Sequence, residues 1–113
     1  MTIMIATALV ADNEGMVSML IEDILVDRGF VVSIANTRAQ LDAALADPAG
    51  WSLVVIDTDL ATGEEMKAWN VTKIVLCTGR PADELADRFP NIPYVSKPCS
   101  AEDFDVVLGS SHD

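Results

Sequence analysis

A chain of 113 residues, half of them hydrophobic, suits one compact domain with a buried core, so a single domain over residues 1–113 is predicted. Eighteen acidic residues against seven basic ones give a formal net charge of -11, which repels nucleic acid and anionic lipid and argues against both as direct partners. No apolar run approaches the about 20 residues that span a membrane, and the N-terminus lacks the features of a signal peptide. Two cysteines without an export signal fit a reducing compartment, so a cytoplasmic location is expected.

Apolar runs alternate with amphipathic stretches along the chain. Strands are predicted at residues 5–11, 30–35, 53–57, 73–77 and 94–96. Helices are predicted at 13–29, 36–50, 63–70 and 100–109, with a short helix in the proline-rich stretch 80–93 that starts near Pro81. Strands that alternate with helices are typical of βαβ units, and near-continuous apolar strands are typical of a sheet covered on both faces. The sequence therefore predicts an α/β domain with a doubly wound, mostly parallel sheet.

Local signals mark the ends of several predicted helices. The first helix carries an apolar stripe at helical spacing, formed by Met16, Val17, Leu20, Ile21, Ile24 and Leu25. Gly29 suits its C-terminal stop, and Asn36 and Thr37 are capping candidates for the second helix. Ser100 followed by Asp103 resembles a capping box at the start of the last helix.

Polar residues gather where the predicted strands end. In chain order they are Asp12-Asn13, Asp57, Thr78-Gly79 and Lys97-Pro98. Ligands of doubly wound sheets bind at the carboxyl ends of the strands, so these side chains are expected to converge. Clustered carboxylates repel one another, and Mg²⁺ relieves the repulsion by accepting carboxylate, carbonyl and water oxygens. An aspartate beside Mg²⁺ can attack a phosphoryl group to give an acyl phosphate, with an ammonium and a hydroxyl stabilising the transferred group.

This set of residues resembles the receiver domain of two-component response regulators. The resemblance rests on four stretches that together cover nearly the whole chain: LVADNEGMVSMLIEDIL, VVIDTDL, VLCTGRP and YVSKP. It implies a flavodoxin-like sheet of five parallel strands in the order 2-1-3-4-5. LATGEE and LCTGRP further resemble an atypical subgroup of stand-alone receivers with a "FATGUY"-type motif.

The resemblance also implies roles for the residues at the strand ends. Asp57 corresponds to the phosphoacceptor. Asp12, Asn13, Asp57 and the backbone carbonyl of Asp59 correspond to the Mg²⁺ ligands.

The remaining implied roles concern the switch and the partners. Thr78 and Lys97 would contact the phosphoryl group, and Thr78 and Tyr94 would form the switch. The donor would be a histidine kinase or a histidine phosphotransfer protein. The chain ends just after the last predicted helix, so the receiver is expected to stand alone. It would not be a multiple-turnover enzyme: it would signal by binding a downstream protein or act as a phosphate sink.

The sequence departs from the family pattern at several positions. Asn13 stands where a second acid is usual, and Ala61 stands where a proline is usual. The stretch between Asp57 and Thr78 is short, which predicts a truncated third helix, and prolines predict a weak fourth helix. Cys99 follows Lys-Pro where an aromatic residue is common.

Two other hypotheses fit part of the pattern. Haloacid-dehalogenase-like phosphatases also combine four hydrophobic residues followed by Asp-x-Asp with a later threonine and lysine. In such a phosphatase Asp57 would be the nucleophile and Asp59 the general acid/base. That family needs a further acidic motif after the lysine, whereas the acids after Lys97 are better explained as a helix cap and a solvated face, and Asp12 is left without a role. The other hypothesis is an interaction module of receiver fold that is not phosphorylated. Asn13 and the missing proline favour it, and the retained Asp57, Thr78 and Lys97 oppose it.

Overall fold

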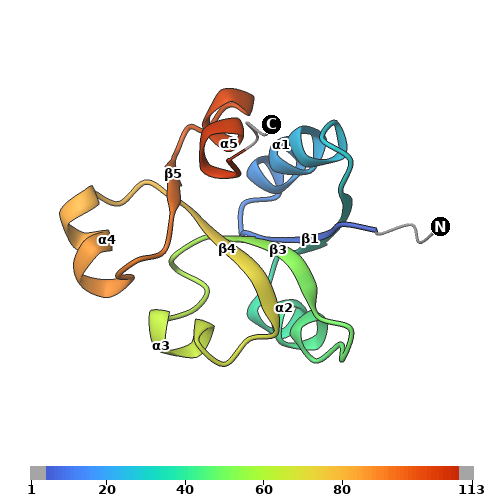
Figure 1. Ribbon diagram of the computed structural model, residues 1–113. Helices are drawn as coiled ribbons and strands as arrows, with labels where there is room; N and C mark the ends of the chain where they lie inside the picture. The colour runs from blue at the N-terminus through green and yellow to red at the C-terminus, as the bar shows by residue number, and fades with distance from the viewer. Residues whose placement is uncertain (1–4, 110–113) are drawn as a thin grey trace.

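The computed structural model describes residues 5–109 and contains five strands that alternate with five helices (Figure 1). The strands are β1 (Thr7–Ala11), β2 (Val31–Ala35), β3 (Trp51–Ile56), β4 (Val71–Thr78) and β5 (Tyr94–Ser96). The helices are α1 (Gly15–Val26), α2 (Arg38–Leu45), α3 (Gly63–Met66), α4 (Ala82–Arg88) and α5 (Ala101–Val107). Every predicted strand and helix is present, although most are shorter or shifted by a few residues at their ends.

The strands form one sheet in the order β2-β1-β3-β4-β5, and all four neighbouring pairs are parallel. This confirms the doubly wound sheet and the order 2-1-3-4-5. Parallel neighbours need crossover connections, and the intervening helices supply them. As a consequence, the carboxyl ends of β1, β3, β4 and β5 lie along one edge of the sheet.

Two apolar cores lie on opposite faces of this sheet. Ala8 and Val10 of β1 belong to the core under α1 and α5, whereas Leu9 and Ala11 belong to the core under α2, α3 and α4. Figure 1 shows α1 and α5 on one side of the sheet and α2 and α3 on the other. Successive strand residues point to opposite faces, so an unbroken apolar strand fills both cores at once.

The apolar stripe predicted for the first helix is only partly buried. Ile21, Ile24 and Leu25 enter the core, whereas the side chains of Met16 and Leu20 are exposed. The stripe is wider than the face that α1 presents to the sheet, so Met16 and Leu20 are left in solvent. The helix ends at Val26, before the glycine predicted to stop it; Gly29 follows with a φ of 90°.

The third helix is a single turn of four residues, which confirms that it is truncated. Thr62 caps it, and Glu65 returns a hydrogen bond to the backbone of Thr62 in a capping box. At Gly63 an added Cβ would lie 2.8 Å from the carbonyl oxygen of Arg88, so only glycine allows α3 this close to the end of α4. The fourth helix has seven residues and follows Pro81, as predicted. Within residues 5–109, no helix is long and apolar enough to cross a membrane.

Candidate functional site

Backbone hydrogen bonds extend the sheet by one residue and thereby fix the side chains of the site. The amide of Asp12 donates to the carbonyl of Ala35 at 3.1 Å, and the amide of Asp57 donates to Ala11 at 2.9 Å. The amide of Lys97 donates to the carbonyl of Thr78 at 2.8 Å. Each functional residue is therefore held by the neighbouring strand.

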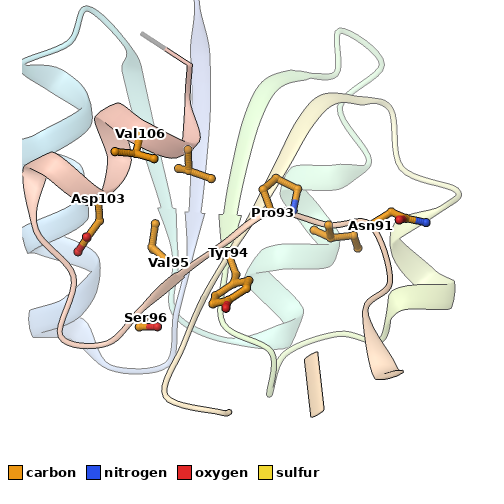
Figure 2. Close-up of a pocket in the computed structure, with 9 residues that line it drawn as sticks. Asn91, Pro93, Tyr94, Val95, Ser96, Asp103 and Val106 are labelled. Atoms are coloured by element: carbon orange, nitrogen blue, oxygen red, sulfur yellow. The ribbon is translucent and has the colours of Figure 1, made fainter. Parts of the chain in front are cut away.

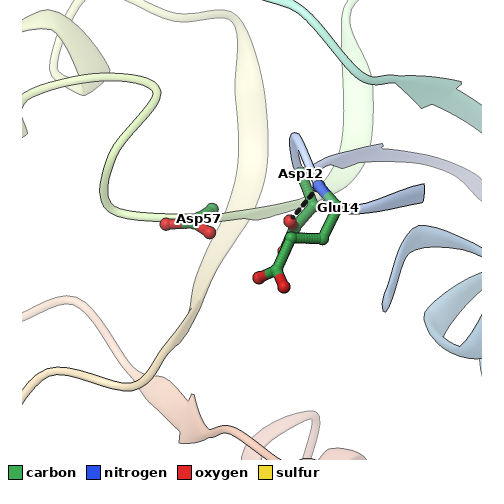
Figure 3. Close-up of side chains that lie close together, drawn as sticks. All are labelled: Asp12, Glu14 and Asp57. Carbon is green, nitrogen blue, oxygen red and sulfur yellow. Dashed lines mark hydrogen bonds between the residues drawn. The ribbon is translucent and has the colours of Figure 1, made fainter. Parts of the chain in front are cut away.

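Three carboxylates meet at this edge of the sheet. One oxygen each from Asp12, Glu14 and Asp57 lies within 4.8 Å of the others (Figure 3). Asp12 and Asp57 are buried, at 1% and 5% exposure, whereas Glu14 is exposed. Figure 3 shows Asp12 and Glu14 coming from the loop after β1, with Asp57 facing them from the end of β3.

Lys97 bridges all three carboxylates. Its Nζ lies 2.8 Å from Oδ2 of Asp57, 2.9 Å from Oε1 of Glu14 and 3.0 Å from Oδ2 of Asp12. Burial lowers the pKa of the Lys97 ammonium, but hydrogen bonds to the carboxylates outweigh it and hold the pKa well above its ordinary value. The lysine therefore stays charged and offsets part of the repulsion among the acids.

The carboxylate of Asp12 is incompletely satisfied. Its Oδ1 accepts a hydrogen bond from the amide of Glu14 at 2.9 Å. Its Oδ2 lies 3.0 Å from the Lys97 ammonium in an ion pair, but this buried oxygen has no hydrogen-bond partner among the described residues. Burial raises the pKa of Asp12, and the contacts with Glu14 and Lys97 oppose that rise. This oxygen is available to a cation.

The main chain at Asp12 is anchored from behind by two polar side chains. Asn36 donates to the carbonyl of Asp12 at 2.8 Å and to Oγ of Ser18 at 2.9 Å. The Ser18 hydroxyl is buried and lies 3.2 Å from the same carbonyl. Asn36 thus supports the site instead of capping α2, and Thr37 is the cap, with its hydroxyl accepting from the amide of Gln40.

The donor set fits a hard divalent cation. Mg²⁺ prefers carboxylate oxygens and keeps part of its water shell, and the cluster combines two buried carboxylates with an exposed one at its rim. Asp12, Asp57 and Glu14 are the residues that would hold it. Glu14 was not predicted as a ligand; the sequence signal for it is an acid two residues after Asp12. In the structure the amide of Glu14 donates to the Asp12 carboxylate, which brings the Glu14 side chain to the cluster. Asn13 is exposed, and its role as a ligand stays a prediction, as does that of the Asp59 carbonyl.

Thr78 and Tyr94 occupy different environments. Thr78 is buried; its hydroxyl lies 3.1 Å from that of Thr58 and accepts from the amide of Arg80 at 3.0 Å. Tyr94 is 40% exposed and lines a surface pocket between β5 and α5 (Figure 2). The pairing of β4 with β5 sets Thr78 beside Ser96, so the two predicted switch residues are connected through neighbouring strands.

Arg80, at the edge of the site, was not predicted from the sequence to take part in it. Arg80 forms ion pairs with Asp59 at 2.7 Å and with Glu84 of α4 at 2.9 Å. These hydrogen bonds raise the pKa of its guanidinium. The amide of Asp59 in turn donates to Oδ1 of Asp57 at 2.9 Å. Arg80 therefore joins the loop after Asp57 to the start of α4.

Comparison with protein-family models and with curated proteins finds no match. Solved structures do match. A receiver domain of an HD domain-containing protein from Pseudomonas fluorescens Pf-5 has a TM-score of 0.77 and 19% identity, over 96% of this chain and 94% of that one. A CheY-like receiver domain from Methylobacillus flagellatus has a TM-score of 0.75 and 18% identity, over 95% and 98%. A response regulator receiver protein from Sinorhizobium medicae WSM419 has a TM-score of 0.74 and 22% identity, over 94% and 93%. With the strand order described above, these likenesses show that the chain has the fold of response regulator receiver domains.

Proposed function

We propose that the protein is a receiver that accepts a phosphoryl group on Asp57 from a phosphohistidine of a histidine kinase or histidine phosphotransfer protein. The observation that carries the proposal is the position of Asp57, buried at the end of β3 with Oδ2 2.8 Å from the ammonium of Lys97 and two further carboxylates beside it. The fold shared with receiver domains supports the same conclusion.

The chemistry follows from these contacts. A carboxylate oxygen of Asp57 attacks phosphorus, the phosphorus–nitrogen bond of the donor breaks, and the electron pair leaves with the imidazole. Lys97 is placed to stay with the transferred group as a fixed positive charge. Bound Mg²⁺ would supply further positive charge against the phosphoryl oxygens and the acidic cluster. Asp57 has its own Oδ1 held by the amide of Asp59, which fixes the orientation of the carboxylate.

We propose that Thr78 and Tyr94 carry the signal away from Asp57. A phosphoryl group on Asp57 offers new acceptors to the Thr78 hydroxyl, which now contacts Thr58. Any movement of Thr78 is passed to β5 through the strand pairing, and Tyr94 lies in β5 beside a surface pocket. The output is then a changed surface for a protein partner, or the protein acts as a phosphate sink. In neither role does it turn over substrate repeatedly.

The phosphatase hypothesis is less well supported. Asp59, its general acid/base, is held by Arg80 at 2.7 Å. Of the acids that follow Lys97, Asp103 caps α5 and Asp105 pairs with Arg28. Of the acids after Lys97 that the structure describes, none is a member of the cluster around Asp57.

Intact-mass analysis after incubation with acetyl phosphate and Mg²⁺ tests the proposal. One phosphoryl group per chain is expected, labile to hydroxylamine and lost in Asp57→Asn. Asp23→Asn, which alters an exposed carboxylate on α1, is the matched control and should label normally. A label retained in Asp57→Asn overturns the assignment of the acceptor. No label on the native chain would favour the interaction module, whereas repeated hydrolysis of small phosphate esters that is lost in Asp59→Asn would favour the phosphatase.

A further inference from the structure

The two cysteines of the chain meet beneath the candidate site. The sulfur atoms of Cys77 and Cys99 lie 3.9 Å apart, with the Cys77 thiol donating to the sulfur of Cys99. Cys77 is in β4 and Cys99 is in the loop between β5 and α5, and 22 positions separate them in the sequence. Both are free thiols in the core under α1 and α5. No other cysteine competes for either partner.

The two thiols differ in access and in acidity. Cys77 is fully buried, whereas Cys99 keeps 8% of its surface exposed. The hydrogen bond from Cys77 lowers the pKa of Cys99, and the same bond raises the pKa of Cys77. Thiolates are the nucleophilic form of cysteine, so Cys99 is suited to react first. Cys77, whose sulfur lies 3.9 Å away, is placed to react with the product. Because so little of Cys99 is exposed, a small oxidant can reach its sulfur more easily than a bulky disulfide reagent can.

We propose that Cys77 and Cys99 form a reversible disulfide on reaction with a hydroperoxide, and that this bond regulates the phosphoacceptor site. The Cys99 thiolate attacks a peroxide oxygen, the oxygen–oxygen bond breaks, and the leaving oxygen takes a proton. Cys99 is then a sulfenic acid. The Cys77 sulfur attacks it, the sulfur–sulfur bond forms, and the sulfenic oxygen leaves with the Cys77 proton as water. In total the two thiols lose two electrons, and hydrogen peroxide is reduced to two water molecules.

The position of the pair connects it to the site. Cys77 immediately precedes Thr78, and Cys99 follows Lys97 by two residues. Closing a gap of 3.9 Å to a covalent bond displaces at least one of the two sulfur atoms, and each sulfur belongs to a segment that carries a residue of the site. The amide of Lys97 donates to the carbonyl of Thr78, and the Lys97 ammonium contacts Asp57, so a displacement of either segment is expected to reach the site. Small displacements of groups that position a reaction are costly, so the disulfide is expected to slow phosphorylation.

Thiol counting tests the bond itself on the full chain. After treatment with hydrogen peroxide, denaturation and alkylation with N-ethylmaleimide, the chain should carry no adduct, and prior reduction with dithiothreitol should restore two. Met16, which is 87% exposed, reports the oxidant dose through its sulfoxide. Two adducts per chain at a dose that oxidises Met16 would overturn the proposal, and so would a disulfide between chains on a non-reducing gel.

Two variants test the order of the steps. In Cys77→Ala, peroxide should leave a sulfenic acid on Cys99 that dimedone traps. In Cys99→Ala, the buried Cys77 should stay reduced under the same treatment. Trapping at Cys77 in Cys99→Ala as fast as at Cys99 in Cys77→Ala would contradict the assigned roles. Both variants keep the strand and loop backbone, and circular dichroism checks that they fold.

The proposed regulation by the disulfide rests on the proposed phosphorylation of Asp57. Its test distinguishes a failure of the regulation from a failure of the phosphorylation. Acetyl phosphate labelling of the oxidised chain is expected to be about tenfold slower than that of the reduced chain, with recovery after dithiothreitol. Cys99→Ala, whose remaining cysteine should stay reduced, should label at the same rate before and after peroxide. Equal rates for the oxidised and reduced native chain would overturn the regulation. Absence of label in both forms would instead refute the phosphoacceptor, while the thiol count still decides whether the disulfide forms.

Discussion

Lys97 is the residue on which the electrostatics of the metal-free site depend, and Lys97→Met removes its charge while it keeps most of the side-chain volume. The ammonium contacts Asp57, Glu14 and Asp12 at 2.8–3.0 Å. Removing one partner of a fully buried ion pair costs about 3–5 kcal/mol, because it leaves a buried charge uncompensated. The exposed pair with Glu14 adds at most about 1 kcal/mol. Since 18% of the Lys97 side chain is exposed, we expect a loss of about 2–3 kcal/mol in the free energy of unfolding.

The conditions under which this loss disappears identify its cause. Mg²⁺ replaces the missing positive charge, so the loss should be large in chelator and mostly recovered with saturating Mg²⁺. Burial already raises the pKa of Asp12, so the folded protein binds that proton more tightly than the unfolded chain does. Without Lys97 this pKa rises further. The difference in unfolding free energy between Lys97→Met and the native chain should therefore narrow as the pH is lowered from neutrality toward the raised pKa of Asp12.

Urea unfolding followed by circular dichroism measures these changes in unfolding free energy. It is carried out with and without Mg²⁺, at neutral pH and at lower pH. Lys67→Met is the matched control. Within residues 5–109, Lys67 pairs only with the exposed Glu64, so the substitution should change stability by less than about 1 kcal/mol. A loss in Lys97→Met that is the same in chelator and in Mg²⁺ and does not vary with pH would refute the electrostatic account. The lysine would then contribute through packing alone.

Three further predictions address the metal, the switch and the core. Asn13→Asp should raise the affinity for Mg²⁺ by about tenfold and slightly destabilise the metal-free fold, because it adds one negative charge to the pocket. Tryptophan fluorescence titration measures the affinity, and thermal melts in chelator measure the stability. An unchanged affinity means that residue 13 does not face the metal. A beryllofluoride mimic of the phosphoryl group should shift amide resonances over residues 79–96 as well as around Asp57, and shifts confined to Asp57 would rule out the switch. Phe104→Ala should lower the free energy of unfolding in urea by about 3–5 kcal/mol, since Phe104 is the fully buried residue of α5. Val106→Ala, which alters a side chain 82% exposed, is its control, and equal losses would mean that α5 does not pack as described.

Local patterns in the sequence were sufficient for the elements and their order. The helix starts at Thr37 and Ser100 could be predicted because a cap depends on residues three positions apart, and both form the expected side-chain bonds. The convergence of Asp12, Asp57 and Lys97 could be predicted as well. Once the strands are parallel, their carboxyl ends must share one edge, so residues that follow the strands become neighbours whatever their distance in sequence.

The α/β class, the edge of the sheet that carries the site, and the presence of Asp12, Asp57 and Lys97 at that edge could be read from the sequence, because they follow from hydrophobic period and chain direction. Which further side chains meet there became known only from the folded structure. Glu14 reaches Lys97 across 83 positions, Cys77 meets Cys99, and Met16 is left in solvent although it shares the spacing of the buried residues. Such contacts depend on how far each helix is rotated against the sheet and on how the loops fold back. Packing of residues distant in sequence sets both, and no local pattern records it.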